Sequence, residues 1–542
     1  FLHMRIIIIA GCILLTLFTH AQTCTLSSDT ISRQGQIDSF NINYPSCNNI
    51  IGTLTITGSV SDLKPLVSIT KVSGSLIIEN TKLTDLNGLE NIDSINSLIL
   101  KGNAFLKNLQ GLEGLEYINV ISLESNIEIL EINNISATNI SNFSVSLCPK
   151  LKEIVGFNNS SQMTGINIAD NAGLDRIDAF KEVEFINGIF RLYNNANLKQ
   201  LNTATRLKMV HGFLEIVNLK NLSQLPTFDS LVIANQISII NLHEISKLPD
   251  FTNLKLVNGT FEIGSNYRLT KIPQFPSLKI IKGSLEIGLD LQIKDFDGFI
   301  VLDSIYGSLR FRELPGGNTE KISGFKKLKF IGLDFMVLGL YNLREITGFS
   351  SLKKVERVVA LNSLHKIKNF NAFKNLEYIG RLQISRCLQL DDISGITGID
   401  FNKLNNLTIN YNDSLSYCHY EPICQYLKAK KGSYYVGFNK KGCNNTEEIL
   451  EACRTVGVDD DTATNITLSP NPTESDFLLT LSDYVPSDGQ LVMYDMMGRA
   501  VLHQPVYYDI NHVSIVKLPT GTYLYQVSDG IKILKRGKLV RI

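Results

Sequence analysis

The sequence predicts a leucine-rich-repeat-like architecture in the broad sense: a parallel β-solenoid of about sixteen coils, followed by a small antiparallel β-sandwich. A phrase of the form Gly-x-apolar-x-apolar returns every 22 to 26 residues over most of the chain, which is typical of stacked repeats. Near residue 456 the pattern changes to short alternating segments separated by Pro and Gly, which indicates a different domain. The length of 542 residues also favours an elongated array, because it exceeds what one compact core usually holds.

The first 21 residues have the pattern of a secretory signal peptide. A short basic start precedes an apolar run over residues 6–18, and Ala21 offers a small residue for cleavage. A lipoprotein signal ending at Cys12 is the alternative, but the residues after Cys12 are apolar where a polar tether is expected. We therefore expect residues 1–21 to direct export.

Charge and cysteine content narrow the possible functions. The chain has 52 basic residues (Lys plus Arg) and 52 acidic residues (Asp plus Glu). Its net charge therefore produces no electrostatic attraction toward nucleic acid or an anionic membrane. Removal of the signal peptide takes Cys12 away and leaves eight cysteines, an even number that is consistent with an oxidising compartment. Cys148 and Cys387 lie inside the repeats, where we expect them to be buried free thiols.

The apolar residue that follows the recurring glycine marks one anchor for each coil. The sixteen anchors are Leu54, Leu76, Leu98, Ile121, Phe143, Ile166, Phe190, Leu214, Ile237, Phe261, Leu285, Leu309, Phe335, Val359, Leu382 and Leu407. The anchor and the second residue after it are both apolar, which predicts a short strand with one buried face. Stacking the coils would join these strands into one parallel sheet over a continuous core.

After each predicted strand the apolar spacing lengthens to three residues, as in Ile293, Phe296 and Phe299. This spacing favours tight turns of 3₁₀ or helical character over a second alternating strand. Asparagine often follows the strand, at Asn80, Asn103, Asn126, Asn171, Asn195 and Asn241. Because asparagine tolerates left-handed backbone and its amide can bond turn peptide groups, we expect a partial asparagine ladder.

One stretch carries a resemblance to a known type of repeat. The segment SCNNIIGTLTITGSVSDLKPLVSITKVSGSLIIEN, residues 46–80, resembles the leucine-rich repeats of receptor L domains, including the cysteine before the first strand. The resemblance covers about residues 24–455. It implies an N-terminal cap over residues 22–47, repeats over 48–415 and a C-terminal cap over 416–455.

The same resemblance implies disulfide bonds in both caps. An open stack exposes its core and its strand edges, so both ends need to be closed. The sequence alone allows three pairings of the four cysteines in the C-terminal cap. The bonds that the resemblance implies are Cys24–Cys47, Cys418–Cys443 and Cys424–Cys453.

The C-terminal part of the chain carries a second resemblance. Residues 456–465 are small, polar and acidic and are expected to form a linker, and the alternating pattern of residues 466–542 predicts the sandwich. Its motifs are, in order, Pro470-Asn471-Pro472, Met493-Tyr494-Asp495, Gly498-Arg499, Leu518-Pro519-x-Gly521-x-Tyr523 and Gly537-Lys538-Leu539-Val540. Together they resemble the type A C-terminal sorting domain of proteins exported by the type IX secretion system of Gram-negative bacteria.

This resemblance implies an export route and partners. The chain would cross the inner membrane by its signal peptide and the outer membrane through the type IX machinery. Cleavage in the linker would follow, with attachment to surface lipopolysaccharide or release. The basic residues of the last strand would suit a recognition surface, although a solvated strand edge explains them equally simply.

No motif for catalysis, a metal or a cofactor stands out. The histidines are scattered, and the cysteine spacing does not form a zinc site. The sequence also lacks a Gly-x-Ser-x-Gly elbow, a phosphate loop and a dinucleotide fingerprint. We therefore expect no enzyme activity, no metal and no cofactor.

The candidate binding surface is the solvent face of the predicted sheet. Its candidate residues are Arg191, Tyr193, Phe213, Glu215, Glu262, Glu286, Arg310 and Arg312. Because parallel strands lie about 4.8 Å apart, Glu262 and Glu286 would be like charges side by side unless a cation, a ligand or Arg310 offsets them. A solvated face with local ion pairs is the simpler interpretation, and a ligand site is the alternative.

These observations lead to one main hypothesis and two alternatives. We expect an exported recognition or adhesion protein that binds a protein or glycan, and no nucleic acid, through this face. A right-handed β-helix polysaccharide lyase or hydrolase would use Glu262 and Glu286 as a carboxylate pair. The three-residue spacing argues against it, because such coils need several alternating strands. A purely structural spacer or adhesin is the third possibility.

Overall fold

The computed structural model describes residues 22–133, 135, 137–289, 292–313, 317–456, 466–482, 486, 488–530 and 532–542. Its contacts separate two compact units, Phe1–Ile449 and Leu450–Ile542. The first unit contains the repeats, and the second contains the C-terminal tail. The predicted signal peptide lies outside the described residues, as does the predicted linker apart from its first residue.

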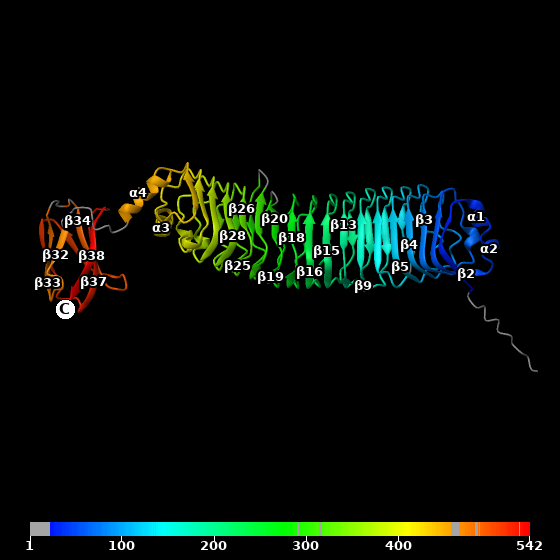
Figure 1. Ribbon diagram of the computed structural model, residues 1–542, viewed down its shortest axis with the longest axis horizontal. Helices are drawn as coiled ribbons and strands as arrows, with labels where there is room; N and C mark the ends of the chain where they lie inside the picture. Colours follow the sequence, from blue (N-terminus) through cyan, green and yellow to red (C-terminus); the bar gives the residue numbers. More distant parts are fainter. Residues whose placement is uncertain are drawn as a thin grey trace, which may run out of the picture. The chain divides into compact units, whose positions relative to one another are not determined.

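The repeats form a solenoid in which every coil contributes one strand to a main parallel sheet (Figure 1). These strands are β1 (Gln22–Ile31), β2 (Cys47–Thr57), β3 (Lys71–Glu79), β4 (Ser94–Lys101), β5 (Tyr117–Glu124), β7 (Asn142–Ser146), β10 (Gly165–Ala169), β13 (Phe190–Tyr193), β15 (Met209–Val217), β16 (Ile233–Ile240), β18 (Phe261–Gly264), β20 (Leu285–Leu289), β23 (Leu309–Glu313), β26 (Phe335–Leu338), β28 (Lys354–Asn362), β29 (Tyr378–Ser385), β30 (Asn406–Asn410) and β31 (Ser433–Gly437). Short strands that precede some of them in the same sheet are β9 (Gln162–Met163), β12 (Phe185–Ile186), β17 (Leu256–Val257), β19 (Ile280–Ile281), β22 (Ser304–Ile305) and β25 (Phe330–Ile331).

The predicted solenoid is confirmed, since each anchor lies in its own strand and adjacent anchors stand opposite each other. Ile237 pairs with Leu214 on one side and with Phe261 on the other. Phe261 in turn pairs with Leu285. The sheet is longer than the predicted repeats, because β1 and β31 of the two caps extend it.

The recurring glycine precedes the anchor where adjacent coils approach most closely. A Cβ atom on Gly74 would lie 2.0 Å from the carbonyl oxygen of Gly52. A Cβ atom on Gly212 would lie 2.3 Å from the carbonyl oxygen of Gly188. No side chain fits at such distances, so the repeated glycine follows from the backbone contact between coils.

A row of stacked phenylalanine rings runs through the core of seven consecutive coils. The row consists of Phe228, Phe251, Phe275, Phe299, Phe325, Phe349 and Phe373. Adjacent ring centroids lie 4.5 to 5.8 Å apart, within the range of favourable aromatic contact. The row joins these coils to one another inside the solenoid.

Two columns of residues follow the strands, whereas the sequence predicted a single asparagine ladder. The first column has left-handed backbone, with φ of 51° at Asn80 and 58° at Asn241. The second column is buried and holds Asn103, Asn126, Asn171, Asn195, Asn266, Asn412 and Asn439. Asn80 and Asn241 therefore form part of the turn and do not belong to the buried ladder.

Each buried asparagine joins its coil to the preceding one. The Oδ1 atom of Asn171 accepts a hydrogen bond from the Cys148 amide (3.0 Å), and its Nδ2 donates to the Val145 carbonyl (3.1 Å). Asn195 bonds the Asn171 amide and the Ile168 carbonyl in the same way. One side chain thus satisfies a buried donor and a buried acceptor.

Cys148 and Cys387 are buried free thiols, as expected, and they occupy the asparagine column. Their thiols donate to the carbonyls of Ser146 (3.4 Å) and Ser385 (3.5 Å). Burial raises the pKa of Cys148 to about 11 and that of Cys387 to about 12. Both thiols are therefore protonated and unreactive at neutral pH.

The prediction that only turns follow each strand is wrong for seven coils. Two short parallel sheets are formed by β6 (Glu131–Ile132), β8 (Glu153–Gly156), β11 (Arg176–Ala179) and β14 (Gln200–Asn202), and by β21 (Asp295–Phe296), β24 (Lys321–Ile322) and β27 (Glu345–Ile346). Tight 3₁₀ turns occur at η1 (Lys64–Leu66), η2 (Asn371–Phe373), η3 (Ser394–Ile396) and η4 (Phe401–Lys403). Stacked coils already lie at sheet spacing, so even two extended residues can pair with the next coil.

The N-terminal cap closes the stack with two short helices and a disulfide bond. The helices are α1 (Gln34–Asp38) and α2 (Phe40–Asn43), which bury Ile37 and Phe40. Cys24 is bonded to Cys47, and strand β1 pairs in parallel with β2. The cap therefore also supplies the first strand of the main sheet.

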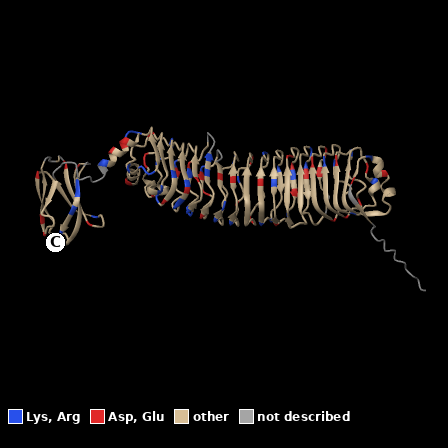
Figure 2. Cartoon of the chain, viewed as in Figure 1, with Lys and Arg blue, Asp and Glu red and all other residues tan. Residues whose placement is uncertain are grey.

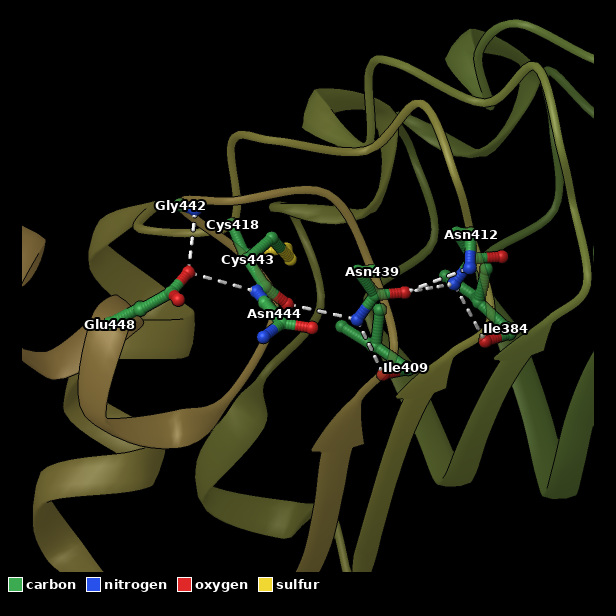
Figure 3. Close-up of a disulfide and its surroundings, with 9 residues drawn as sticks. All are labelled: Ile384, Ile409, Asn412, Cys418, Asn439, Gly442, Cys443, Asn444 and Glu448. Atoms are coloured by element: carbon green, nitrogen blue, oxygen red, sulfur yellow. Dashed lines mark hydrogen bonds between the residues drawn. A yellow bond between two sulfur atoms is a disulfide. The ribbon is translucent and has the colours of Figure 1, made fainter.

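The C-terminal cap contains α3 (Glu421–Ala429) and α4 (Thr446–Val456). Cys418 is bonded to Cys443, and Cys424 and Cys453 are also disulfide-bonded. Figure 3 shows that the asparagine ladder ends at this disulfide, where Asn439 Nδ2 donates to the Cys443 carbonyl (2.9 Å). The cap thus takes over the hydrogen bonds that another coil would make.

The tail forms two antiparallel sheets, which confirms the predicted fold of this region. Its strands are β32 (Ile466–Ser469), β33 (Asp476–Leu481), β34 (Gly489–Tyr494), β35 (Ala500–Val506), β36 (Ile510–Ser514), β37 (Gly521–Asp529) and β38 (Lys532–Arg541). One sheet has the order β32-β33-β36 and the other β35-β34-β37-β38. Buried apolar side chains from both sheets form one core.

The ladder predicts a stability effect at Asn171. We expect Asn171→Ala to lower the free energy of unfolding by about 1–3 kcal/mol, because the Cys148 amide and the Val145 carbonyl lose their buried partner. Urea unfolding followed by circular dichroism measures the change. Asn221→Ala is the control, since its amide bonds Asn197 at the exposed surface. Equal stabilities of the two variants would contradict the role of the ladder.

The C-terminal disulfide should contribute to the stability of the cap. A Cys418→Ala/Cys443→Ala variant is expected to be about 2–5 kcal/mol less stable, because the end of the stack loses a covalent closure. Calorimetry of the oxidised chain measures the loss, and Cys387→Ala, which removes a free thiol, should cost less. Peptide mapping that found all four cap cysteines as free thiols would contradict the assignment.

Candidate functional site on the main sheet

The structure places the predicted surface residues on the solvent face of neighbouring strands. Arg191 on β13 stands opposite Glu215 on β15. Glu262 on β18 stands opposite Glu286 on β20, which stands opposite Arg310 on β23. Figure 2 shows acidic and basic positions side by side on these strands.

Two pairs of opposite charge form within this column. The Nε atom of Arg191 lies 2.9 Å from Glu215 Oε2, and its guanidinium lies 4.5 Å from the ring centre of Tyr193. A nitrogen of Arg310 lies 2.6 Å from Glu286 Oε1. Local ion pairs therefore account for four of the eight predicted residues.

Sequence reasoning missed Asp334, which extends this network. Asp334 is only 1% exposed, and its carboxylate lies 3.4 Å from Arg310 and 3.1 Å from Arg357. It comes immediately before the anchor Phe335, in the same column as Phe213. The signal was present, because Asp334 is the only acidic residue that directly precedes an anchor.

Glu262 differs from the other charged residues of the column. No residue that the structure describes gives its carboxylate a hydrogen bond or an ion pair, and it stands between Ser238 and Glu286. Burial, followed by the nearby Glu286 carboxylate, raises the pKa of Glu262 above its usual value. Arg310 therefore offsets Glu286 but leaves Glu262 uncompensated.

Two glycines lie beside the two glutamates. Gly264 and Gly288 occupy the next outward positions on β18 and β20, and a Cβ atom on Gly264 would lie 3.2 Å from Gly288 Cα. Arg312 follows in the same row on β23 and is exposed. Gly264 is buried and Gly288 is partly buried, so these two strands lie close together without side chains at this row.

The remaining predicted residue, Phe213, lies at the border of this surface. It precedes the anchor Leu214 and is 40% exposed.

Within the described part of the chain, no three His, Cys, Asp or Glu side chains are grouped as a metal site requires. The face thus offers carboxylates, guanidinium groups and two aromatic rings for binding.

The motif residues of the tail hold its last strand in place. Asn471 Nδ2 donates to the Lys538 carbonyl (2.7 Å), and its Oδ1 accepts from the Val540 amide (2.9 Å). Gly537 has no room for a side chain, because a Cβ atom would lie 2.4 Å from the Tyr525 hydroxyl. These contacts join the start of the tail to β38.

Two turns of the tail depend on other motif residues. The Tyr523 hydroxyl donates to the Pro519 carbonyl (2.6 Å), within the Leu-Pro-x-Gly-x-Tyr motif. Asp495 accepts hydrogen bonds from the amides of Met497 and Arg499 and pairs with the Arg499 side chain. These bonds lower the pKa of Asp495, the largest effect coming from the Arg499 amide.

Comparison with known families supports the assignment of the tail. Residues 467–540 match the family of secretion system C-terminal sorting domains. A search of curated proteins found no match to the chain. None of the helices in the described ranges is long and apolar enough to cross a membrane. The sorting domain implies interaction with the type IX secretion machinery and export to the outer-membrane surface or the extracellular space.

Truncation of the tail tests its role in export. Deletion of residues 538–542 removes the partners of Asn471 and leaves every coil and both caps unchanged. We expect the truncated chain to fold and to accumulate in the periplasm, as fractionation of the native host would reveal. Gln490→Ala, an exposed change in β34, is the control and should be exported normally. Undiminished surface or medium levels of the truncated chain would contradict the prediction.

Proposed function

We propose that the solenoid is a recognition module that binds a protein or glycan partner through the solvent face of strands β13 to β23, and that the chain is not an enzyme. Export beyond the outer membrane, implied by the tail, brings this face into contact with external partners. The tail itself would serve export and contribute nothing to recognition.

The observation that carries the proposal is the uncompensated carboxylate of Glu262. The other charged residues of the column are paired, whereas Glu262 is half-buried beside a like charge. A partner that supplies an amine, a guanidinium or a hydroxyl group would give this carboxylate the donor that it lacks.

We further infer that the repeats are of the receptor L-domain type of leucine-rich repeat. The apolar anchors and the buried column of Asn or Cys agree with the general pattern of leucine-rich repeats. The cap disulfides Cys24–Cys47 and Cys418–Cys443 are those that this type implies. By the same family argument, cleavage in residues 456–465 would lead to attachment to lipopolysaccharide or to release.

The alternative of a β-helix lyase or hydrolase has weaker support. Among the described residues, strands outside the main sheet occur in seven coils and contain two to four residues. Glu286, one half of the supposed carboxylate pair, is already bound to Arg310. These contacts suit a binding surface better than a pair of catalytic acids.

A charge reversal tests the proposed surface. The native chain would first be screened on glycan and protein arrays, and the strongest ligand carried into titrations. We expect Glu262→Lys/Glu286→Lys to weaken binding by roughly tenfold or more without unfolding, because both side chains face solvent. Glu128→Lys/Glu244→Lys reverses two exposed, paired acids elsewhere and is the control. Unchanged affinity of the Glu262→Lys/Glu286→Lys variant would show that the binding site lies on another surface.

The raised pKa of Glu262 predicts a pH-dependent effect on stability. Because its pKa is raised, the Glu262 carboxyl group binds a proton more tightly in the folded state than in the unfolded state. Ionisation of Glu262 therefore lowers the stability of the fold as pH rises through the folded-state pKa. Glu262→Gln should therefore be more stable than the native chain at pH 7. The difference should disappear below about pH 4, the usual range of glutamate.

Thermal unfolding at both pH values measures this difference. Glu128→Gln, in which an exposed pair with Lys150 is lost, is the control and should show no gain in stability. A native chain as stable as Glu262→Gln at pH 7 would contradict the prediction.

A further inference from the structure

The C-terminal cap carries an unusual concentration of positive charge. Residues 428–441 contain no acidic residue and five lysines, which are Lys428, Lys430, Lys431, Lys440 and Lys441. All five are exposed, and the described residues provide none of them with an ion pair. Elsewhere in the solenoid, lysines such as Lys199 and Lys329 pair with an acid of the preceding coil. The chain as a whole is neutral, so this charge is local.

Three of the four acidic residues of the cap make contacts with groups other than these lysines. Glu421 accepts a hydrogen bond from Gln425, and Glu451 pairs with Arg454. Glu448 accepts hydrogen bonds from the amides of Gly442 (2.6 Å) and Asn444 (3.2 Å), as Figure 3 shows. These carboxylates are used for helix and loop structure, and the five lysines keep their charge available for a ligand.

The lysines flank the last strand of the main sheet. Lys428, Lys430 and Lys431 lie at or just after the end of α3, before β31, and the other two follow β31. A strand rises about 3.3 Å per residue, so β31 separates the two groups by about 13 Å or more. This separation suits a chain of several linked units better than a single small anion.

Exposed aromatic rings lie between the two groups of lysines. Tyr435 is 47% exposed and Phe438 is 58% exposed. The Phe438 ring stacks on Tyr411 with centroids 4.7 Å apart and ring planes 1° apart. The Arg386 guanidinium lies 5.8 Å from the ring centre of Tyr411. Rings in this setting offer flat apolar surface to a ligand.

The backbone at Phe438 and Tyr411 adds to this argument. Both residues have φ of 57°, the left-handed conformation that most coils assign to Asn, Ser, Asp or Gly at this position. A large side chain there is unfavourable and gains little from burial, since both rings are exposed. In the two last coils this position therefore presents two stacked rings to solvent, where a ligand can reach them.

We propose that this surface, formed by the five lysines with Tyr411, Tyr435 and Phe438, binds an anionic polysaccharide. Its carboxylate or sulfate groups would pair with the lysines, and the apolar faces of its sugar rings would pack on the aromatic rings. An exported protein meets polymers of this class outside the cell, which favours them over nucleic acid. The surface lies at the last coil, away from Glu262 on β18, so it does not depend on the sheet site.

Binding of the secreted chain to alginate, a polymer of uronic acids, tests the proposal, with neutral dextran as the uncharged comparison. We expect binding to alginate only, and binding that weakens as NaCl is added. Lys428→Gln/Lys431→Gln/Lys440→Gln/Lys441→Gln should weaken it by roughly tenfold or more. Lys430 is left unchanged because its backbone is left-handed, with φ of 50°.

The matched control removes four exposed lysines elsewhere, which are Lys220, Lys247, Lys326 and Lys327. It should bind alginate like the native chain. Equal losses in the two variants, or no binding of the native chain to alginate at low salt, would overturn the proposal. Tighter binding to duplex DNA than to alginate would assign the surface to nucleic acid instead.

A second variant separates ring packing from charge. Phe438→Ala keeps every lysine and should weaken alginate binding several-fold with an unchanged salt dependence. Native-like circular dichroism would show that the fold is retained, as expected for an exposed ring. Unchanged affinity in this variant would overturn the assigned role of the aromatic rings.

Discussion

The close stacking of each coil on the preceding one is the constraint on which the rest of the structure depends. The parallel hydrogen bonds of the main sheet set the spacing, and the glycines before the anchors are the points where two backbones nearly touch. The asparagine ladder and the phenylalanine row work only if equivalent residues of adjacent coils stand opposite each other. Both caps preserve that condition by supplying a strand in register, β1 at one end and β31 at the other.

The same stacking decides the chemistry of the surface. Residues about 24 positions apart become neighbours, so each charge is stabilised or destabilised by whatever the next coil places opposite it. Glu286 meets Arg310 and forms a pair, whereas Glu262 meets Glu286 and is left without a cation. The lysines of the cap have no following coil, which removes one source of acidic partners.

The architecture was predictable because the same apolar pattern, which is weak evidence in one coil, recurs in every coil. One apolar pair such as Leu285 and Ile287 proves little, but sixteen equivalent pairs leave few alternatives to stacked strands. The finer features depend on where a strand ends, which periodicity does not locate to one residue. Asn80 and Asn103 therefore looked alike in sequence, although one lies in the turn and the other in the core. Asp334 stands out in sequence as the only acid directly before an anchor, but its pairing with arginines of two other coils is visible only in the structure.

The phenylalanine row has a mechanical consequence. It is continuous from Phe228 to Phe373, and Ala204 separates it from the stacked rings of Phe157 and Phe180 in the same column. Since each coil contacts only its neighbours, resistance to opening is a local property that varies along the stack. A solenoid held at one end under fluid shear would yield first where the rings are missing. The coil that carries Ala204 would therefore open before the coils that the row joins.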